Sequence, residues 1–203
     1  MSAIVQPDVL PTIPIALKIG GAALLVVIGL AYWRVYGPGN FLWLSDLALA
    51  SVTLALLFES PLLASMAAVG VLPLEVLWTI DFLSGARLFG YTAYMFDARS
   101  PLSMRALSLF HLALPPIIIF LLAKLGYDGR ALLWQTVLTW IALVLSYRLT
   151  EPERNVNWVF GPVRPQDSLP PPLYLGLEML ALPCLVFAPM HLLLERLLPS
   201  PHG

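Results

Sequence analysis

The chain has 203 residues, 59% of them hydrophobic and 11% charged, and its mean hydropathy is +0.84. A soluble domain of this length carries about a quarter charged residues, so the composition excludes a soluble globule and indicates a membrane protein. The formal net charge of −1 argues against nucleic-acid binding. Because Cys184 is the only cysteine, an internal disulfide and a metal site of several cysteines are excluded, and we expect neither a metal nor a cofactor.

Six segments are long and apolar enough to span a membrane as helices, which takes about 20 residues. In chain order they cover residues 15–36, 41–58, 62–83, 102–125, 131–149 and 171–198. Prolines inside the third, fourth and sixth segments predict kinks, which neighbouring helices make tolerable within a bundle. The sequence therefore predicts an all-α, polytopic transmembrane helical bundle that forms one domain over residues 1–203.

The N-terminal residues and the basic residues predict how the bundle is placed in the membrane. Residues 1–12 lack the basic region of a signal peptide, so we expect the first apolar segment to be retained. We call the end of the bundle that carries the first, third and fifth loops the front end. Its basic residues are Arg34, Arg87, Arg99, Arg105, Arg148, Arg154 and Arg164. The opposite end carries Lys18, Lys124, Arg130 and Arg196. Because basic residues concentrate on the cytoplasmic side, we expect the front loops to be cytoplasmic, and we place the chain in a bacterial inner membrane.

Several polar residues fall at or near the front end of the apolar segments. Ser45 and Asp46 lie just inside the second segment, and His111 lies about nine residues into the fourth, roughly 13 Å deep at 1.5 Å per residue. The loop after the fifth segment brings Asn155 and Asn157 to the same end. An ionisable residue at membrane depth is expensive and marks a functional site by default. We therefore expect a polar site at the front end.

These residue types suit nucleophilic catalysis. The Ser45 hydroxyl becomes a nucleophile when a base takes its proton, and His111 is the expected base because imidazole titrates near neutral pH. Asp46, Asp97 or a backbone carbonyl would orient the imidazole. An oxyanion needs donors aimed at it. The expected substrate-binding residues, which include these donors, are Asn155, Asn157, Trp158 and Trp43.

Three short motifs follow one another along the chain: Trp43-Leu44-Ser45-Asp46-Leu47-Ala48-Leu49, Ser108-Leu109-Phe110-His111 and Asn155-Val156-Asn157-Trp158-Val159-Phe160. Together they resemble the YwaF-like membrane proteins and, more remotely, the androgen-inducible/ADTRP-like intramembrane hydrolases. The resemblance implies a compact helical bundle that cleaves or transfers acyl chains on lipids. It places Ser45 at the nucleophile position and His111 at the histidine position, and it matches Asn157 and Trp158 to an asparagine-aromatic element. The relatives are expected to carry cysteine or threonine where this chain has Ser45.

Each of these residues also has a structural interpretation. A serine in a membrane helix usually bonds its own backbone or packs against a neighbour, and His111 can bridge two helices. Asp46 can cap a helix or pair with an arginine, and Asn155 and Asn157 are typical of turns. Contacts inside the bundle would also satisfy the remaining polar side chains, for example through pairing of Glu75 with Gln135 or of Asp81 with Arg87. The residues considered for such contacts are Glu75, Asp81, Gln135 and Glu178.

Three functions remain open from the sequence. The first is an intramembrane serine/histidine lipid hydrolase or acyltransferase that acts on the acyl esters of a membrane lipid. The second is a non-catalytic subunit, assembly factor or lipid-binding protein. Its protein partner would dock on loops 84–100 and 150–170, whose aromatic and arginine residues suit an interface. The third is a small transporter with a proton path through the intramembrane carboxylates, although no internal repeat is visible.

Overall fold

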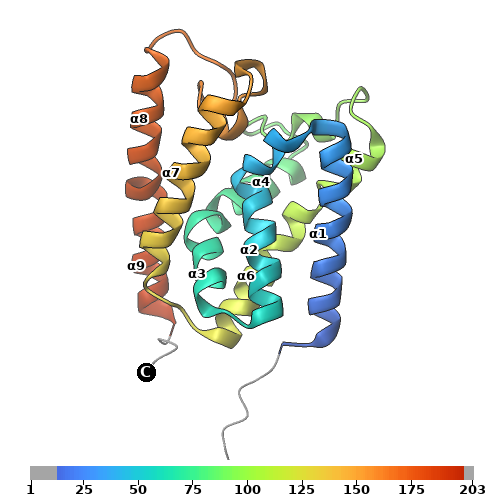
Figure 1. Cartoon of the computed structure of the whole chain (residues 1–203), viewed down its shortest axis with the longest axis vertical. Coiled ribbons are helices and arrows are strands. Elements are labelled where there is room, and N and C mark those ends of the chain that lie inside the picture. Colours follow the sequence, from blue (N-terminus) through green and yellow to red (C-terminus); the bar gives the residue numbers. More distant parts are fainter. Residues whose placement is uncertain (1–12, 199–203) are drawn as a thin grey trace, which may run out of the picture.

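The computed structural model describes residues 13–198, and within that range the chain is helical without any strand (Figure 1). The α-helices are α1 (Ile15–Tyr36), α2 (Leu44–Phe58), α3 (Pro61–Gly70), α4 (Leu72–Leu83), α5 (Leu102–Leu107), α6 (Phe110–Leu125), α7 (Ala131–Leu149), α8 (Pro171–Ala181) and α9 (Ala188–Leu197). Short helical turns lie between them: η1 (Pro38–Leu42), η2 (Ala93–Met95), η3 (Pro152–Arg154), η4 (Val156–Trp158) and the π-helical turn Leu182–Phe187. The all-α class is confirmed. Residues 1–12, where we expect no signal peptide, lie outside the described range.

Several of the helices are suited to a membrane. Within the described residues, four segments are long and apolar enough to cross a bilayer, and α3 with α4 forms a bent pair that makes a fifth. The four are Ile15–Tyr36, Leu102–Leu125, Ala131–Leu149 and Pro171–Leu197. The second expected span forms only α2, whose 15 residues extend about 22 Å, less than the roughly 30 Å of a bilayer core. The helices therefore fit an integral membrane protein with four to five spans, and the expected count of six is not confirmed.

The bend between α3 and α4 is the feature that shapes the interior. The two helices meet at 52°, and Pro73 lies in the first turn of α4, where its missing N–H removes no hydrogen bond. Below the bend, α3 packs against α7, whereas above it α4 packs against α6. Gly70 permits the close approach of α3 and α7, because a Cβ atom there would lie 2.3 Å from Nε2 of Gln135. The bend thus carries α4 away from α7, while α3 stays packed against it.

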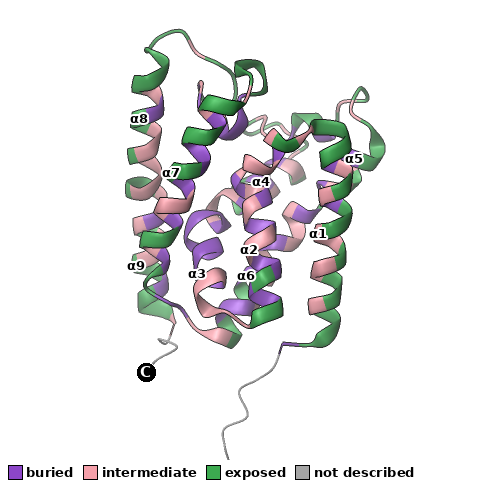
Figure 2. Cartoon of the chain, viewed as in Figure 1, coloured by how far each residue is buried: buried purple, intermediate pink, exposed green. Residues whose placement is uncertain are grey.

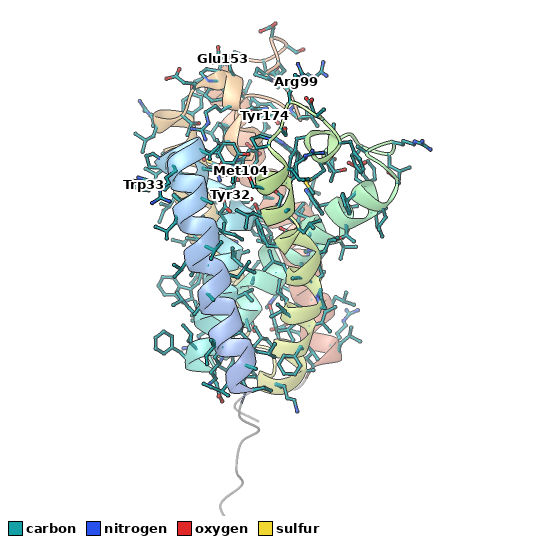
Figure 3. All side chains as sticks on the ribbon, turned by 90° about the vertical axis from the view of Figure 1, so that its right-hand side faces the viewer. Tyr32, Trp33, Arg99, Met104, Glu153 and Tyr174 are labelled. Atoms are coloured by element: carbon teal, nitrogen blue, oxygen red, sulfur yellow. The ribbon has the colours of Figure 1, made fainter. Side chains whose placement is uncertain are left out.

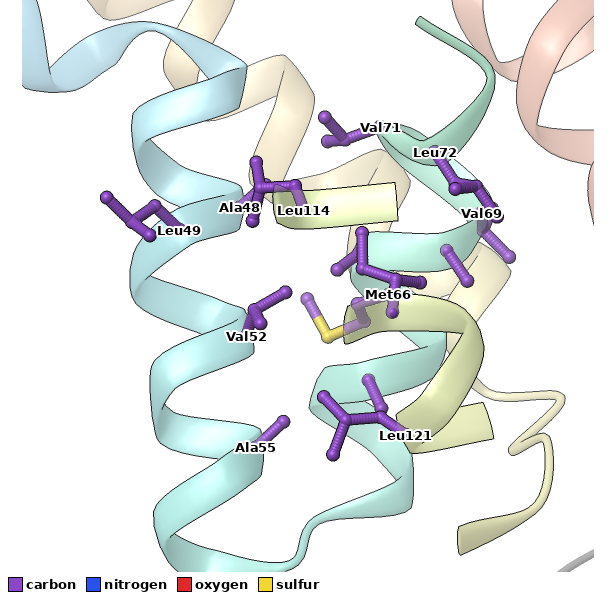
Figure 4. Packing of buried hydrophobic residues seen from close by; sticks show 14 of the residues in the cluster. Ala48, Leu49, Val52, Ala55, Met66, Val69, Val71, Leu72, Leu114 and Leu121 are labelled. Atoms are coloured by element: carbon purple, nitrogen blue, oxygen red, sulfur yellow. The ribbon is translucent and has the colours of Figure 1, made fainter. Parts of the chain in front are cut away.

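The core lies around α3, whose residues from Ala64 to Gly70 are all buried (Figure 2). Small side chains of α3, including Ala64, Ala67 and Ala68, let neighbouring helices approach closely, as is common in membrane bundles. Figure 4 shows Val52 of α2, Met66 of α3 and Leu121 of α6 in this core, where they belong to one cluster of buried residues. The outward faces of α1 and α8 instead expose large apolar residues, which a bilayer accommodates and water does not.

The loops assigned to the front end do lie together. Figure 1 shows the α1–α2, α4–α5 and α7–α8 connections at the top of the bundle, opposite the start of α1 and the end of α9. Figure 3 shows Arg99 and Glu153 of these loops at that end, together with Tyr32 and Trp33 near the end of α1. Tyr32 is buried, whereas the neighbouring Trp33 side chain is 60% exposed. At the front end, α1 therefore turns Tyr32 into the bundle and Trp33 out of it.

Asp81, at the front end of α4, organises the loop that follows. Its carboxylate accepts hydrogen bonds from the backbone N–H groups of Phe89, Gly90 and Thr92 at 2.8, 3.2 and 2.9 Å, and from the Thr92 hydroxyl at 2.9 Å. These partners satisfy the carboxylate, so the suggested pairing of Asp81 with Arg87 is replaced by bonds to the loop backbone. Asp81 thus holds the α4–α5 loop over the front of the bundle.

Candidate functional site

A cavity of about 540 Å³ opens in the front half of the bundle, where residues of α1, α2, α4, α6, α8 and the front loops line it. Its polar and charged lining residues are Asn40, Ser45, Asp46, Glu75, Ser100, Ser108, His111, Asn157 and Glu178. Its aromatic lining residues are Tyr32, Tyr36, Trp43, Trp78, Tyr91, Tyr94, Phe110 and Trp158. Of the seven site residues expected from the sequence, six line this cavity, and Asn155 does not. A concave pocket with a few convergent polar groups is the usual form of a small-molecule site.

His111 is held from two directions. Its Nδ1 atom lies 2.7 Å from Oε2 of Glu75 on α4, and both side chains are largely buried. The imidazole ring stacks between Trp78 and Phe110, with ring centroids 4.5 and 4.2 Å away. The acceptor that orients His111 is therefore Glu75, and the expected acceptors Asp46 and Asp97 do not take this place. With Nδ1 engaged, the second ring nitrogen is left to exchange a proton with a substrate or a nucleophile.

The other two expected acceptors have partners of their own. Oδ2 of Asp46 accepts a hydrogen bond from the Asn40 amide at 2.8 Å, and Asp46 also interacts electrostatically with His111 and Glu75. Asp97 lies in the α4–α5 loop, where the Arg99 guanidinium donates to it at 2.7 Å and lowers the pKa of its carboxyl. Asp46 thus contributes to the electrostatics of the cavity, whereas Asp97 belongs to the loop surface.

Ser45 lies in the first turn of α2, half-buried beside Asp46 and on the lining of the cavity. Among residues 13–198, no hydrogen bond joins its hydroxyl to His111. The first N–H groups of a helix have no partner inside the helix. At the start of α2, the Leu44 N–H donates to Oδ1 of Asn157 at 2.9 Å. The backbone N–H groups of Ser45 and Asp46 have no acceptor within the described part of the chain. The start of α2 therefore presents a hydroxyl and free backbone donors at one place.

The two asparagines of the α7–α8 loop are structural. The Asn157 amide donates to the Leu42 carbonyl at 2.7 Å and to Oγ of Ser146 at 3.1 Å, so both its amide hydrogens are used. Together with its bond to the Leu44 N–H, this fixes the start of α2 to the end of α7. Asn155 bonds only its own loop, through the Gly161 carbonyl and the Phe160 N–H. The expectation that these amides bind an oxyanion is therefore not supported by the hydrogen bonds they make.

Trp158 and Trp43 fulfil the geometric part of their expected role, because both line the cavity. Trp158 contacts Tyr91 of the α4–α5 loop, with ring centroids 4.9 Å apart. Its backbone lies in the left-handed region, at φ +64°, which turns the chain beside the cavity. The Trp158 indole N–H makes no hydrogen bond within residues 13–198, so it remains an available donor.

Two carboxylates of the site, Glu75 and Glu178, are not among the site residues that the sequence predicts. The sequence indicates them only as candidates for polar contacts inside the bundle. The sequence suggests a pair of Glu75 with Gln135, but Gln135 instead donates to Thr139 at 3.2 Å and Glu75 pairs with His111. Glu178 of α8 lines the cavity, and its Oε2 atom is buried without a hydrogen-bond partner in the described part of the chain. Carboxylates in the middle of apolar segments were the signal for both residues, because such groups need a partner or a ligand.

The site has the parts of a base-assisted nucleophile, namely a hydroxyl, an imidazole and a carboxylate that orients the imidazole. Within residues 13–198, no group of three or more His, Cys, Asp and Glu side chains is arranged to hold a metal ion.

Comparisons of the chain with protein-family models, curated proteins and solved structures find no match.

Proposed function

We propose that the protein is an intramembrane acyl-ester hydrolase or acyltransferase, with Ser45 as nucleophile and His111 as general base. The observation that carries this proposal is the 2.7 Å contact between His111 and Glu75 beside a cavity that Ser45 also lines. A histidine oriented by a buried carboxylate is the base half of a Ser-His-acid triad, which is recognised by geometry and not by sequence position. The resemblance to YwaF-like proteins implies the same class of reaction.

The reaction would proceed through an acyl-enzyme. The Ser45 oxygen attacks the ester carbonyl carbon, and its proton passes to the free nitrogen of His111 while Glu75 holds the other nitrogen. The tetrahedral oxyanion is met by donors at the start of α2, the N–H groups of Ser45 and Asp46, and by the Trp158 indole. Collapse breaks the bond to the leaving alcohol, which takes the proton from His111. Water or a second alcohol then attacks the acyl carbon while His111 takes its proton. The bond between the acyl carbon and the Ser45 oxygen breaks, and His111 returns the proton to Ser45, which gives hydrolysis or acyl transfer.

Ser45 and His111 must approach each other for this step, because no hydrogen bond joins them in the described structure. Catalytic hydrogen bonds are often long without substrate and shorten only in the substrate complex. The serine belongs to α2 and the histidine to α6, and a substrate held between these helices would contact both. The approach of the Ser45 hydroxyl to His111 is therefore the step of the proposal to test first.

The test is covalent labelling of the purified full-length protein with a fluorophosphonate probe, which reacts with activated serines. We expect labelling of the parent and its loss in Ser45→Ala and in His111→Ala, with both variants keeping their helical circular dichroism. Ser168→Ala, which changes an exposed loop serine outside the cavity, is the matched control and should be labelled like the parent. Labelling that persists in Ser45→Ala would show that Ser45 is not the nucleophile.

A non-catalytic lipid-binding or assembly role is the second candidate, and the missing Ser45–His111 hydrogen bond favours it. In that case the His111–Glu75 pair is a helix-bridging contact, and the cavity holds a lipid without cleaving it. The front loops 84–100 and 150–170 would then be the docking surface for a protein partner. No fluorophosphonate labelling of the folded parent, together with co-purification of a stoichiometric partner, would support this candidate over the first.

A further inference from the structure

We infer that the cavity takes an uncharged lipid ester with a free hydroxyl group, as in a diacylglycerol, which enters from the bilayer between α4 and α8 and donates its hydroxyl to Glu178. The inference rests on the proposed function only for the cleavage or transfer of the ester after binding. The binding step itself depends only on the cavity and on Glu178.

The charges around the cavity disfavour an anionic head group. Its lining contains the carboxyl groups of Asp46, Glu75 and Glu178, whereas among the described residues no arginine or lysine lines it. A phosphate that left water for this space would have no guanidinium or ammonium group to pair with, and burial of an unpaired charge costs several kcal/mol. A hydroxyl head group carries no such penalty. The cavity thus favours a neutral lipid over an anionic phospholipid.

Glu178 supplies a binding partner for the hydroxyl. Its Oε2 atom is buried and accepts no hydrogen bond from residues 13–198, and because the residue lines the cavity, a rotation of the carboxyl group would turn this oxygen towards a ligand there. A buried acceptor without a donor costs about 1–3 kcal/mol, and a ligand that brings the donor recovers this energy. A hydroxyl bound at Glu178 would leave the ester of the same lipid free to lie deeper in the cavity, towards α2 and α6.

The entrance follows from the helix packing. Leu77 of α4 and Glu178 of α8 both line the cavity, yet α4 and α8 are not a packed pair among the described residues. Both helices also expose apolar side chains that do not line the cavity, including Val76 at 41% and Leu177 at 49%. A lipid in the bilayer would therefore meet an apolar approach that ends at a carboxyl group, between two helices that do not close on each other.

Photo-crosslinking of the full-length protein in neutral lipid nanodiscs tests this inference. Two probes with the same diazirine-bearing acyl chain are compared, a diacylglycerol and an anionic phosphatidylglycerol, in the Ser45→Ala background so that no probe is turned over. We expect the diacylglycerol probe to label about tenfold more strongly, which corresponds to 1.4 kcal/mol. The crosslinked peptides should come from α4 and α8. Equal labelling by the two probes, or labelling confined to other helices, would overturn the inference.

Variants of Glu178 test its role as the hydroxyl acceptor. Glu178→Lys adds the missing positive charge, so labelling should shift from the diacylglycerol to the phosphatidylglycerol probe. Glu153→Lys, the same change in an exposed loop outside the cavity, is the matched control and should keep the parental preference. If Glu178→Lys does not fold, Glu178→Leu is used, which removes the acceptor for the hydroxyl, and diacylglycerol labelling should fall several-fold. Unchanged labelling in the folded Glu178 variant would overturn the role of this residue.

The outcomes separate this inference from the proposed function. Selective crosslinking without any Ser45-dependent fluorophosphonate labelling would keep the lipid specificity and remove the catalytic role. Fluorophosphonate labelling at Ser45 together with unselective crosslinking would keep the catalytic role and remove the lipid specificity.

Discussion

The Nδ1 atom of His111 and the Oε2 atom of Glu75 lie 2.7 Å apart and bridge α6 to α4 across the wall of the cavity. Both side chains are largely buried, with His111 12% and Glu75 3% exposed. The orientation of the imidazole ring is also fixed, because the ring is stacked between two aromatic residues. A buried acid-histidine pair either bridges helices or orients a base. The two roles differ in what happens when the carboxylate loses its charge but keeps its shape.

Glu75→Gln makes this distinction. The glutamine carbonyl still accepts a hydrogen bond from Nδ1, so we expect the fold and the binding of the diacylglycerol probe to remain. The negative charge that would stabilise a protonated His111 is lost, and general-base catalysis is worth about 10²–10⁴-fold in rate. The rate constant of fluorophosphonate labelling at Ser45 should therefore fall by about 10²-fold or more.

Glu195→Gln is the control for Glu75→Gln. Glu195 lies 3.4 Å from Nε2 of His191 near the end of α9, at the opposite end of the bundle from the cavity. Loss of its charge should leave the labelling rate constant unchanged. An equal loss of rate in both variants would show that the effect is general and not specific to His111.

The sequence could predict where the polar groups gather but not how they pair. Alternation of spans and loops brings Ser45, Asp46, His111 and Trp158 to one end whatever the details of packing, and all four line the cavity. The partner of His111 depends on which face of α4 turns inward. That face depends on how the chain leaves the bend between α3 and α4, and spacing along the chain does not encode it.

The sequence alone also does not predict where α2 begins or how the loop that caps it is folded. The apolar residues Phe41 and Leu42 continue the hydrophobic pattern of the second segment, so the sequence predicts that the span begins at Phe41. The structure places them in the 3₁₀ turn η1, and α2 begins at Leu44, where Asn157 caps it from a distant loop. Asn157 reaches this place from a left-handed backbone conformation, φ +55°, which local sequence does not specify.

Asn157→Ala is expected to destabilise the protein. The change removes the cap of the Leu44 N–H and leaves the Leu42 carbonyl and the Ser146 hydroxyl without the Asn157 donor. Loss of a helix cap together with buried hydrogen bonds costs about 2 kcal/mol of folding free energy. The thermal unfolding midpoint of the purified variant in detergent should therefore be lower than that of the parent. Ser45→Ala is the comparison, since its hydroxyl makes no hydrogen bond in the described structure, and its midpoint should match the parent's. An unaltered midpoint in Asn157→Ala would contradict the structural role.

Gly70→Ala should also destabilise the protein, through packing at the bend. The new Cβ atom would lie 2.3 Å from Nε2 and 2.4 Å from Cδ of Gln135, which is itself buried, so the side chain or the helices must move. Overpacking of this kind costs about 1–3 kcal/mol. Gly29→Ala is the control, because nothing lies within 4 Å of its added Cβ atom. Its midpoint should stay level or rise, since alanine is the better helix former. The double variant Gly70→Ala, Gln135→Ala should recover much of the loss, and failure to recover would show that Gln135 is not the obstructing group.

Glu59, in the turn between α2 and α3, should make part of the stability depend on pH. Its Oε1 atom accepts hydrogen bonds from Nζ of Lys18 at 2.7 Å and from the Ile13 N–H at 3.1 Å, and these bonds lower the pKa of the Glu59 carboxyl. Because the pKa is lowered in the folded state, the stabilisation is present above the ordinary glutamate pKa of about 4.3 and is lost as pH falls through the folded-state pKa.

The thermal midpoints of the parent and Glu59→Gln, measured between about pH 7 and pH 3, test this linkage. The parent should be the more stable protein at neutral pH, and the two midpoints should converge as the carboxyl is protonated. Glu151→Gln removes an exposed carboxylate that makes no hydrogen bond within residues 13–198, so its difference from the parent should stay the same over this range. A difference between Glu59→Gln and the parent that does not shrink with falling pH would mean that the Lys18 and Ile13 contacts do not stabilise the ionised carboxylate.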